Sequence, residues 1–122
     1  MLEAKHSLIK SFKFAFDGLK VAILKGRNFR IQLLCGVLAS VVAYYLQFTR
    51  IEWAVLAISI ASILILELIN TSLESITNLV SPEIQEEAKI AKDVAAASVL
   101  LASIASILIG ALVFLPKILN LL

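Results

Sequence analysis

The chain has 122 residues, of which 61% are hydrophobic and 16% charged. Ordinary soluble domains are about 45–50% apolar, so this composition excludes them and predicts an all-α integral membrane protein. The net charge of +2 conceals a basic amino-terminal segment, because residues 1–30 hold seven Lys or Arg side chains and two acidic ones. Beside a membrane helix, such a segment indicates a cytosolic location and contact with anionic lipid, not nucleic-acid binding.

Residues 5–25 are predicted to form an amphipathic helix on the membrane surface. Apolar side chains recur every three or four residues along one face, whereas the opposite face is mostly lysine. The apolar positions are Leu8, Phe12, Phe16, Leu19 and Ile23, and the polar ones are Lys10, Lys13, Asp17 and Lys20. This pattern is typical of a helix in the lipid headgroup layer. An ordinary bundle helix is the alternative, but the chain offers little soluble structure for it to pack on.

Three membrane-spanning helices are predicted, over residues 29–48, 51–79 and 92–115, in a single domain that occupies residues 1–122. The second span is longer than a bilayer requires, so its last turns should project into the headgroup region or beyond. A bundle this small leaves much helix surface facing lipid. We therefore expect a homo-oligomer.

The connections between these helices carry recognisable breaks. Gly26-Arg27-Asn28 separates the surface helix from the first span. Ser81 and Pro82 predict the cap and first position of the next helix, and Pro116 predicts the end of the third span. With the basic amino terminus in the cytosol, the 79–92 connection is cytosolic and the carboxyl terminus lies outside.

A polar stripe on the second span is the main candidate site. The spacing of Glu67, Asn70, Thr71, Glu74 and Asn78 places all five on one face of a helix. Ionisable groups at membrane depth are costly, so they usually face a bundle interior or a wet cavity and mark function. The alternative is a polar seam that only joins helices.

Other polar residues should meet this stripe at the cytosolic surface, since Glu67 lies about 24 Å along the helix from Ile51. These residues are Arg27 and Arg30 before the first span and Lys92 and Asp93 at the start of the third. Carboxylates and amides can bind Mg²⁺, and a lysine can offset phosphate charge. A carboxylate partly removed from water suits a general base.

This chemistry favours phosphoryl transfer from a soluble nucleotide to a lipid hydroxyl. The sequence holds neither the phosphate-binding loop GxxxxGK[ST] nor the HRD and DFG elements of protein kinases. A small ion-coupled transporter is the alternative, because it would also place glutamates in a span.

The segment ELINTSLE, residues 67–74, resembles the E-x-x-N-[ST]-[AS]-[IL]-E signature of bacterial integral-membrane diacylglycerol kinases, a family that includes undecaprenol kinases. The resemblance extends to AKDVAAASVLL from Ala91, to SPE at 81–83 and to GRNFRIQ at 26–32. It covers nearly the whole chain without a gap. It implies a homotrimer of three-span protomers in the bacterial inner membrane, with active sites shared between subunits at the cytosolic face.

The resemblance also implies a role for individual residues, with ATP and a membrane lipid alcohol as substrates and Mg²⁺ as cofactor. Glu67 would be the general base on the lipid hydroxyl, and Glu74 would bind the Mg²⁺ that accompanies ATP. Nucleotide contacts would come from Phe14, Glu74, Glu83, Ile84, Gln85, Lys92 and Asp93, with Lys92 on phosphate. Lipid contacts would come from Ser11, Phe29, Arg30, Gln32, Glu67, Asn70 and Ala96.

The sequence departs from the family pattern at three positions. Gly26 stands where the family usually has a glutamate that is the second side-chain metal ligand. Asn78 replaces a usual aspartate, and Ser7 replaces a basic residue. The alternative is therefore a non-catalytic member that binds lipid or nucleotide. The product would be phosphatidic acid or undecaprenyl phosphate, and RNFRI at 27–31 resembles the undecaprenol-kinase branch.

Overall fold

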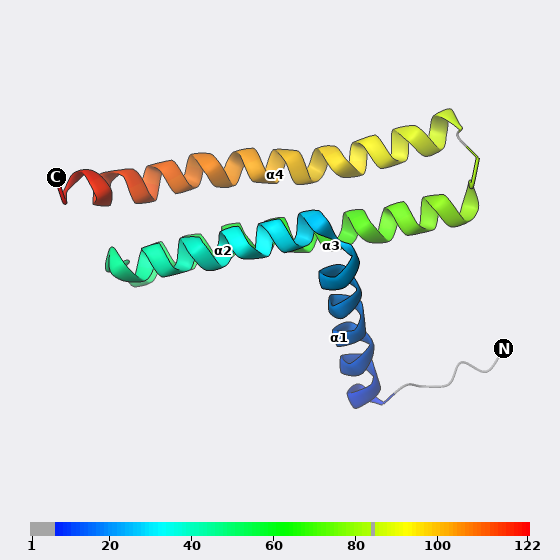
Figure 1. Cartoon of the computed structure of the whole chain (residues 1–122), viewed down its shortest axis with the longest axis horizontal. Coiled ribbons are helices and arrows are strands. Elements are labelled where there is room, and N and C mark those ends of the chain that lie inside the picture. The colour runs from blue at the N-terminus through cyan, green and yellow to red at the C-terminus, as the bar shows by residue number, and fades with distance from the viewer. Residues whose placement is uncertain (1–6, 84) are drawn as a thin grey trace.

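The structure, a computed structural model, describes residues 7–83 and 85–122. These residues form the four helices α1 (Leu8–Lys25), α2 (Arg27–Tyr45), α3 (Arg50–Val80) and α4 (Glu86–Leu119). In the described residues, α2, α3 and α4 are the helices long and apolar enough to cross a membrane. They run side by side, and α1 lies across them (Figure 1). The predicted all-α membrane fold is confirmed.

The helix α1 begins at Leu8, where the Ser7 hydroxyl accepts a hydrogen bond of 3.3 Å from the Lys10 amide. Its predicted first residues, 5 and 6, lie outside the described residues. The apolar face predicted from the periodicity is exposed along its length, as Phe12 and Phe16 illustrate. Residues 7–83 and 85–122 leave this face largely without a packing partner, as expected for a helix that rests in the lipid headgroup layer.

A tight corner at Gly26 joins α1 to α2. A Cβ atom at Gly26 would lie 2.6 Å from the Ala22 carbonyl oxygen, so any larger residue forces the corner to open. Arg30 holds the corner from the α2 side, because its Nη1 donates hydrogen bonds to the carbonyl oxygens of Ile23 at 2.9 Å and Leu24 at 3.0 Å. These carbonyls are left without helical partners where α1 ends.

The bundle is built on α3, which packs along α4 on one side and against α2 on the other. Gly36 permits the close approach of α2, since a Cβ there would lie 2.9 Å from the Ile60 side chain. In the described residues, α2 and α4 make little contact with each other. Space between these two helices is therefore left open along part of the bundle.

The end of the bundle away from α1, which we call the far end, is tied together by Lys117. Its ammonium group lies 3.2 Å from Glu52 Oε2, donates to the Gln47 carbonyl oxygen at 3.2 Å and lies 5.6 Å from the centre of the Phe48 ring. Phe48 also packs on Phe114 with ring centres 4.8 Å apart. These contacts join the last turns of α4 to the turn between α2 and α3.

Two predicted helix ends are wrong. Gln85 precedes the first residue of α4, whereas Ser81 ends α3 and its amide donates to the Thr77 carbonyl oxygen at 2.9 Å. The Ser81 side chain is suitable for capping the start of α4, but Ser81 instead forms the carboxyl-terminal cap of α3. Pro116 does not end α4, which continues to Leu119 because the tertiary contacts of Lys117 hold its last turn.

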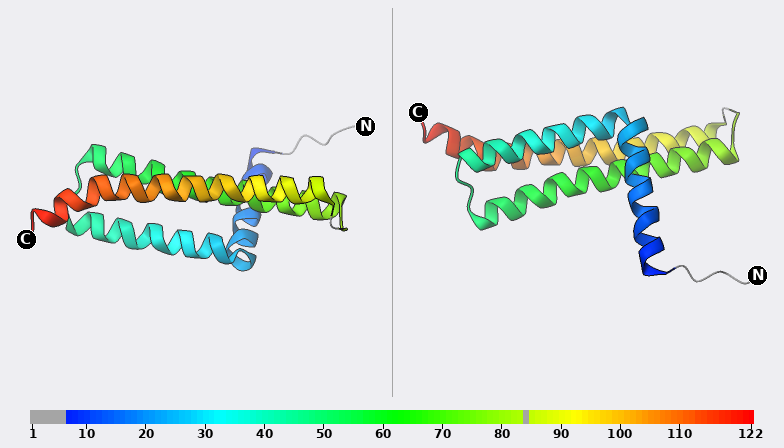
Figure 2. Two further views of the ribbon diagram at one scale, coloured as in Figure 1. Left: turned by 90° about the horizontal axis from the view of Figure 1, so that it is seen from above. Right: turned by 60° about the horizontal axis from the view of Figure 1, so that its bottom comes forward.

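Both α3 and α4 continue beyond the point where α1 joins α2, as the views in Figures 1 and 2 agree. The last turns of α3 thus extend past α1, and their projection beyond the membrane surface stays a prediction. The first span ends at Tyr45, three residues before the predicted boundary at 48, because residues 46–49 form the turn into α3.

Candidate functional site

Glu67 and Asn70 are buried toward the end of the bundle where α1 joins α2, and the two residues are only 5% and 8% exposed. Both lie on the α3 face that the polar spacing predicted. They line a pocket of about 310 Å³, which we call the Glu67 pocket. Its lining is made by Asn28, Ile31 and Gln32 of α2, Glu67 and Asn70 of α3, and Ala96, Val99, Leu100 and Ser103 of α4.

The hydrogen bonds of Asn70 leave one acceptor open. Its Nδ2 donates to Glu74 Oε1 at 3.5 Å, one helical turn away. Its Oδ1 is buried and has no hydrogen-bond partner within residues 7–83 and 85–122. Burying an acceptor without a partner costs about 1–3 kcal/mol, so this atom is a candidate for a ligand contact.

The Glu67 carboxylate has no ion pair with any described lysine or arginine. Thr71, from the same stripe, turns back onto α3, where its hydroxyl donates to the Glu67 carbonyl oxygen at 2.9 Å. The Thr71 hydroxyl is thus used within α3 and leaves the Glu67 carboxylate free. Asn78 is exposed two turns beyond the pocket residue Asn70.

Of the residues assigned to the lipid, the structure brings Gln32, Glu67, Asn70 and Ala96 together in one pocket. The others lie elsewhere. Phe29 is buried near the corner with α1, and Arg30 caps α1. Ser11 is exposed on α1, where its hydroxyl donates to the Ser7 carbonyl oxygen at 3.4 Å.

The residues assigned to the nucleotide lie outside the Glu67 pocket. Lys92 and Asp93 precede Ala96 by about one turn of α4, and Asp93 forms an ion pair of 2.5 Å with Lys89. Glu74 is exposed beyond Asn70 on α3. Glu83 and Gln85 are exposed in the connection between α3 and α4, Phe14 is exposed on α1, and Ile84 lies outside the described residues.

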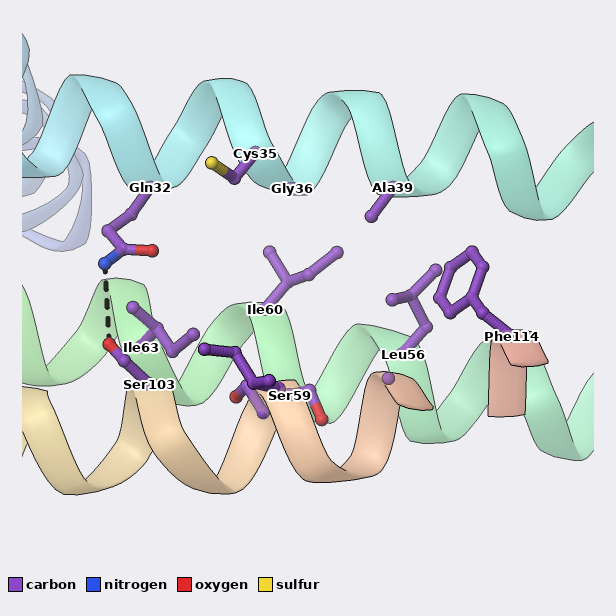
Figure 3. A pocket seen from close by; sticks show the side chains of 13 residues that line it. Gln32, Cys35, Gly36, Ala39, Leu56, Ser59, Ile60, Ile63, Ser103 and Phe114 are labelled. Atoms are coloured by element: carbon purple, nitrogen blue, oxygen red, sulfur yellow. Dashed lines mark hydrogen bonds between the residues drawn. The ribbon is translucent and has the colours of Figure 1, made fainter. Parts of the chain in front are cut away.

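Two polar residues of the pocket, Asn28 and Ser103, were not predicted to belong to the site, nor were the apolar lining residues Ile31, Val99 and Leu100. Asn28 lies four residues before Gln32, so the two carboxamides share a face of α2, and that spacing could have revealed it. Ser103 accepts a hydrogen bond of 3.5 Å from Gln32 Nε2, which links α4 to α2 (Figure 3).

The donors for a metal ion in one protomer are few. No group of three or more His, Cys, Asp or Glu side chains gathers anywhere in the described part of the chain. Glu74 is the carboxylate that accepts a hydrogen bond from Asn70. Mg²⁺ commonly binds one or two carboxylates together with substrate phosphates, so a single exposed glutamate fits a metal that arrives with a nucleotide.

The helices α2, α3 and α4 are long and apolar enough to cross a membrane, and a buried carboxylate and carboxamide lie beside a pocket between them. These features define a membrane protein with a polar site between its spans. Residues 13–114 match the family described as Prokaryotic diacylglycerol kinase. The chain belongs to this family. It is therefore a lipid kinase, and membership of a kinase family implies ATP as the phosphoryl donor.

Several curated relatives are similar over most of this chain. The diacylglycerol kinase of Synechocystis sp. is 44% identical over 117 residues, which are 95% of this chain and 67% of the relative. The undecaprenol kinase of Bacillus subtilis is 32% identical over 92% of this chain and 91% of its own length. The diacylglycerol kinase of Escherichia coli strain K12 is 29% identical over 83% of both chains.

Proposed function

We propose that the protein transfers the γ-phosphoryl group of ATP to the hydroxyl group of diacylglycerol, and that it acts as a homotrimer at the cytosolic face of the bacterial inner membrane. The burial of Glu67 and Asn70 beside an open pocket carries this proposal. The 44% identity to a relative named diacylglycerol kinase supports the choice of lipid.

In this proposal, Glu67 is the general base. Its carboxylate accepts the proton of the lipid hydroxyl while the lipid oxygen forms a bond to the γ-phosphorus. The bond from that phosphorus to the β–γ bridging oxygen breaks, which leaves ADP and the lipid phosphate. No described lysine or arginine pairs with Glu67, so the carboxylate is free to take the proton. A base positioned in this way contributes about 10²–10⁴-fold to a rate.

Glu74 and the nucleotide phosphates would hold Mg²⁺, with Asn70 orienting the Glu74 carboxylate through the 3.5 Å contact. When bound, the metal neutralises charge on the transferring phosphoryl group. Gly26 contributes no ligand in this proposal. Its corner is closed to a side chain, since a Cβ would lie 2.6 Å from the Ala22 carbonyl oxygen.

The nucleotide would approach along the parts of α3 and α4 that continue past α1. Lys92 would contact the phosphates, and Asp93 with residues 83–85 would contact the base or sugar, with Phe14 nearby on α1. Those of these groups that the structure describes lie outside the Glu67 pocket within one protomer. We therefore assign the complete site to neighbouring protomers together.

On the lipid side, Gln32 and Ala96 would contact the headgroup from the pocket walls, with Ser11 and Phe29 closer to α1. Arg30 was assigned a lipid contact, but its guanidinium already caps α1 at 2.9 and 3.0 Å. We propose that Arg30 acts on the lipid by fixing the direction of α1.

The test is transfer of labelled γ-phosphate from MgATP to diacylglycerol and undecaprenol side by side in proteoliposomes. Glu67→Gln should lower turnover by about 10²–10⁴-fold, while Glu87→Gln serves as the matched control. Glu87 is an exposed glutamate in the first turn of α4 and does not line the Glu67 pocket. Unchanged turnover in Glu67→Gln would refute the base, and no product from the native protein on either lipid would favour a binding protein.

Undecaprenol is the second candidate lipid. The observations that favour it are the RNFRI segment at 27–31 and the 32% identity to the undecaprenol kinase of Bacillus subtilis over 91% of that relative. The same assay separates the two lipids. Preferential formation of undecaprenyl phosphate would replace diacylglycerol in the proposal without changing the role of Glu67.

A further inference from the structure

A second pocket, which we call the inner pocket, lies deeper in the bundle than the Glu67 pocket. It has a volume of about 370 Å³ and is lined by residues of α2, α3 and α4. Figure 3 shows side chains from three helices around it, and most of them are apolar. Its walls include Gly36 and Ala39 of α2, Leu56 and Ile60 of α3, and Gly110 and Phe114 of α4.

The inner pocket exists because α2 and α4 both pack on α3 but make little contact with each other in the described residues. Small residues face the gap, and Gly110 leaves open space there, since no atom lies within 4 Å of where its Cβ would be. The pocket ends at the far end of the bundle, where the Phe48 and Phe114 rings pack 4.8 Å apart. These two rings thus close the gap between α2 and α4 at the far end of the bundle.

The inner pocket adjoins the Glu67 pocket. Gln32 and Ser103 line both, and the 3.5 Å hydrogen bond between them marks the junction. On one side of this pair lie Glu67 and the open Oδ1 acceptor of Asn70. On the other side the walls are mostly apolar, and Ser59 and Ser106 are the polar residues among them. Such an arrangement, a few convergent polar groups joined to an apolar cavity, is that of a site for an amphipathic ligand.

We propose that the inner pocket receives the first part of the hydrocarbon chain of the lipid alcohol whose hydroxyl group lies at Glu67. This inference rests on the proposed function, and it adds a binding site for the chain inside the protomer. From Ser103 to Phe114 the pocket follows eleven residues of α4, or about 16 Å of helix. The far-end aromatic residues then limit how far the chain enters, and Gly110 leaves room for it beside α4.

The test combines labelling with kinetics in proteoliposomes. The labelling probe is a dioleoylglycerol analogue with a diazirine in one acyl chain, photolysed without ATP and mapped by peptide analysis. The kinetic substrates are dioleoylglycerol and the short-chain dihexanoylglycerol. The variant Gly110→Leu fills the pocket, and Ala111→Leu is the matched control, because Ala111 is exposed on the same turn and lines neither pocket.

In the native protein, the label should map to inner-pocket residues of α2 and α4. Gly110→Leu should abolish that labelling and lower kcat/KM for dioleoylglycerol by about tenfold or more, since one added methylene in an apolar pocket changes selectivity by about 10–200-fold. Dihexanoylglycerol should change by less than about twofold, because its short chain stays above Gly110. Ala111→Leu should behave as the native protein does.

Each other outcome has a definite meaning. Pocket labelling without any lipid phosphorylation would contradict the proposed function and retain the inner pocket as a lipid site. Labelling spread over lipid-facing residues, or unaffected by Gly110→Leu, would overturn the pocket. An equal loss with both lipids would overturn it too. A change in oligomer size in Gly110→Leu without native labelling would assign the pocket to a helix of a second copy instead.

Discussion

The polar groups at the two ends of the bundle differ in whether they have interaction partners. At the far end, Lys117 has an ion pair, a carbonyl acceptor and an aromatic ring around it, although the Glu52 contact is an ion pair without hydrogen-bond alignment. At the other end, Glu67 is buried with no described cationic partner, and Asn70 Oδ1 has no described donor. The charged group at the far end therefore has partners, whereas the polar groups at the end near α1 lack them among the described residues.

This difference separates stability from activity. A buried group that is fully paired contributes to the folded state, whereas a buried group without a partner costs free energy unless a ligand supplies one. Natural sites often retain such costs because activity depends on them. We therefore expect substitutions at the far end to change unfolding and substitutions near Glu67 to change turnover.

The largest expected effect comes from Glu67→Gln. Turnover should fall by about 10²–10⁴-fold, yet the free energy of unfolding should rise by about 1 kcal/mol, because an unpaired buried charge is removed. Thermal unfolding in detergent, measured with the phosphoryl-transfer assay, tests both halves. A protein that loses activity together with stability would show that Glu67 is a packing residue, and the contrast between the ends would fail.

The next effect concerns the corner beside the site. Gly26→Ala places a Cβ 2.6 Å from the Ala22 carbonyl oxygen, so the corner must open at a cost of about 1–3 kcal/mol. Gly18→Ala is the control, since no atom lies within 4 Å of its added Cβ, and alanine inside α1 should stabilise by about 0.5–1 kcal/mol. Equal melting temperatures for the two variants would show that the corner is not tight.

The same corner shows what the sequence could and could not predict. The three spans and α1 were predictable because hydropathy and periodicity are local properties of the chain. The shared face of Glu67 and Asn70 followed from helix geometry alone. The Arg30 cap on α1 was not predictable, since it depends on the angle between two helices and on where the guanidinium then points.

Helix ends were the weaker part of the prediction for a related reason. Ser81 and Pro82 formed a credible start for α4, but α3 runs on to Val80 and uses Ser81 at its own end. Pro116 disfavours a helix interior, yet contacts made by Lys117 in space keep the last turn of α4. Local signals therefore located the breaks, and tertiary contacts decided which helix took each residue.

The far end has its own prediction. Lys117→Met should lower the free energy of unfolding by about 1–2 kcal/mol, between the values for exposed and fully buried ion pairs, because the Lys117 and Glu52 side chains are 25% and 24% exposed. Turnover at saturating substrate should stay within about twofold. Chemical or thermal unfolding measures the first quantity. A loss of turnover at full stability would show that the far end acts on the site directly.

The smallest effect should come from Lys89→Met, which removes an ion pair on the α4 segment that bears Asp93. The Lys89 and Asp93 side chains are 69% and 61% exposed, so the pair is solvated and should contribute less than about 0.5 kcal/mol. The substitution leaves the Asp93 carboxylate without its ion pair. Because we assign Asp93 to the nucleotide, we expect KM for MgATP to change by no more than about twofold. Unfolding and MgATP titrations on the same samples give both values.

A destabilisation as large as that of Lys117→Met would contradict the contrast between the two ion pairs, because solvent screening would then not distinguish them. A large rise in KM with unchanged stability would instead place Lys89 itself on the nucleotide.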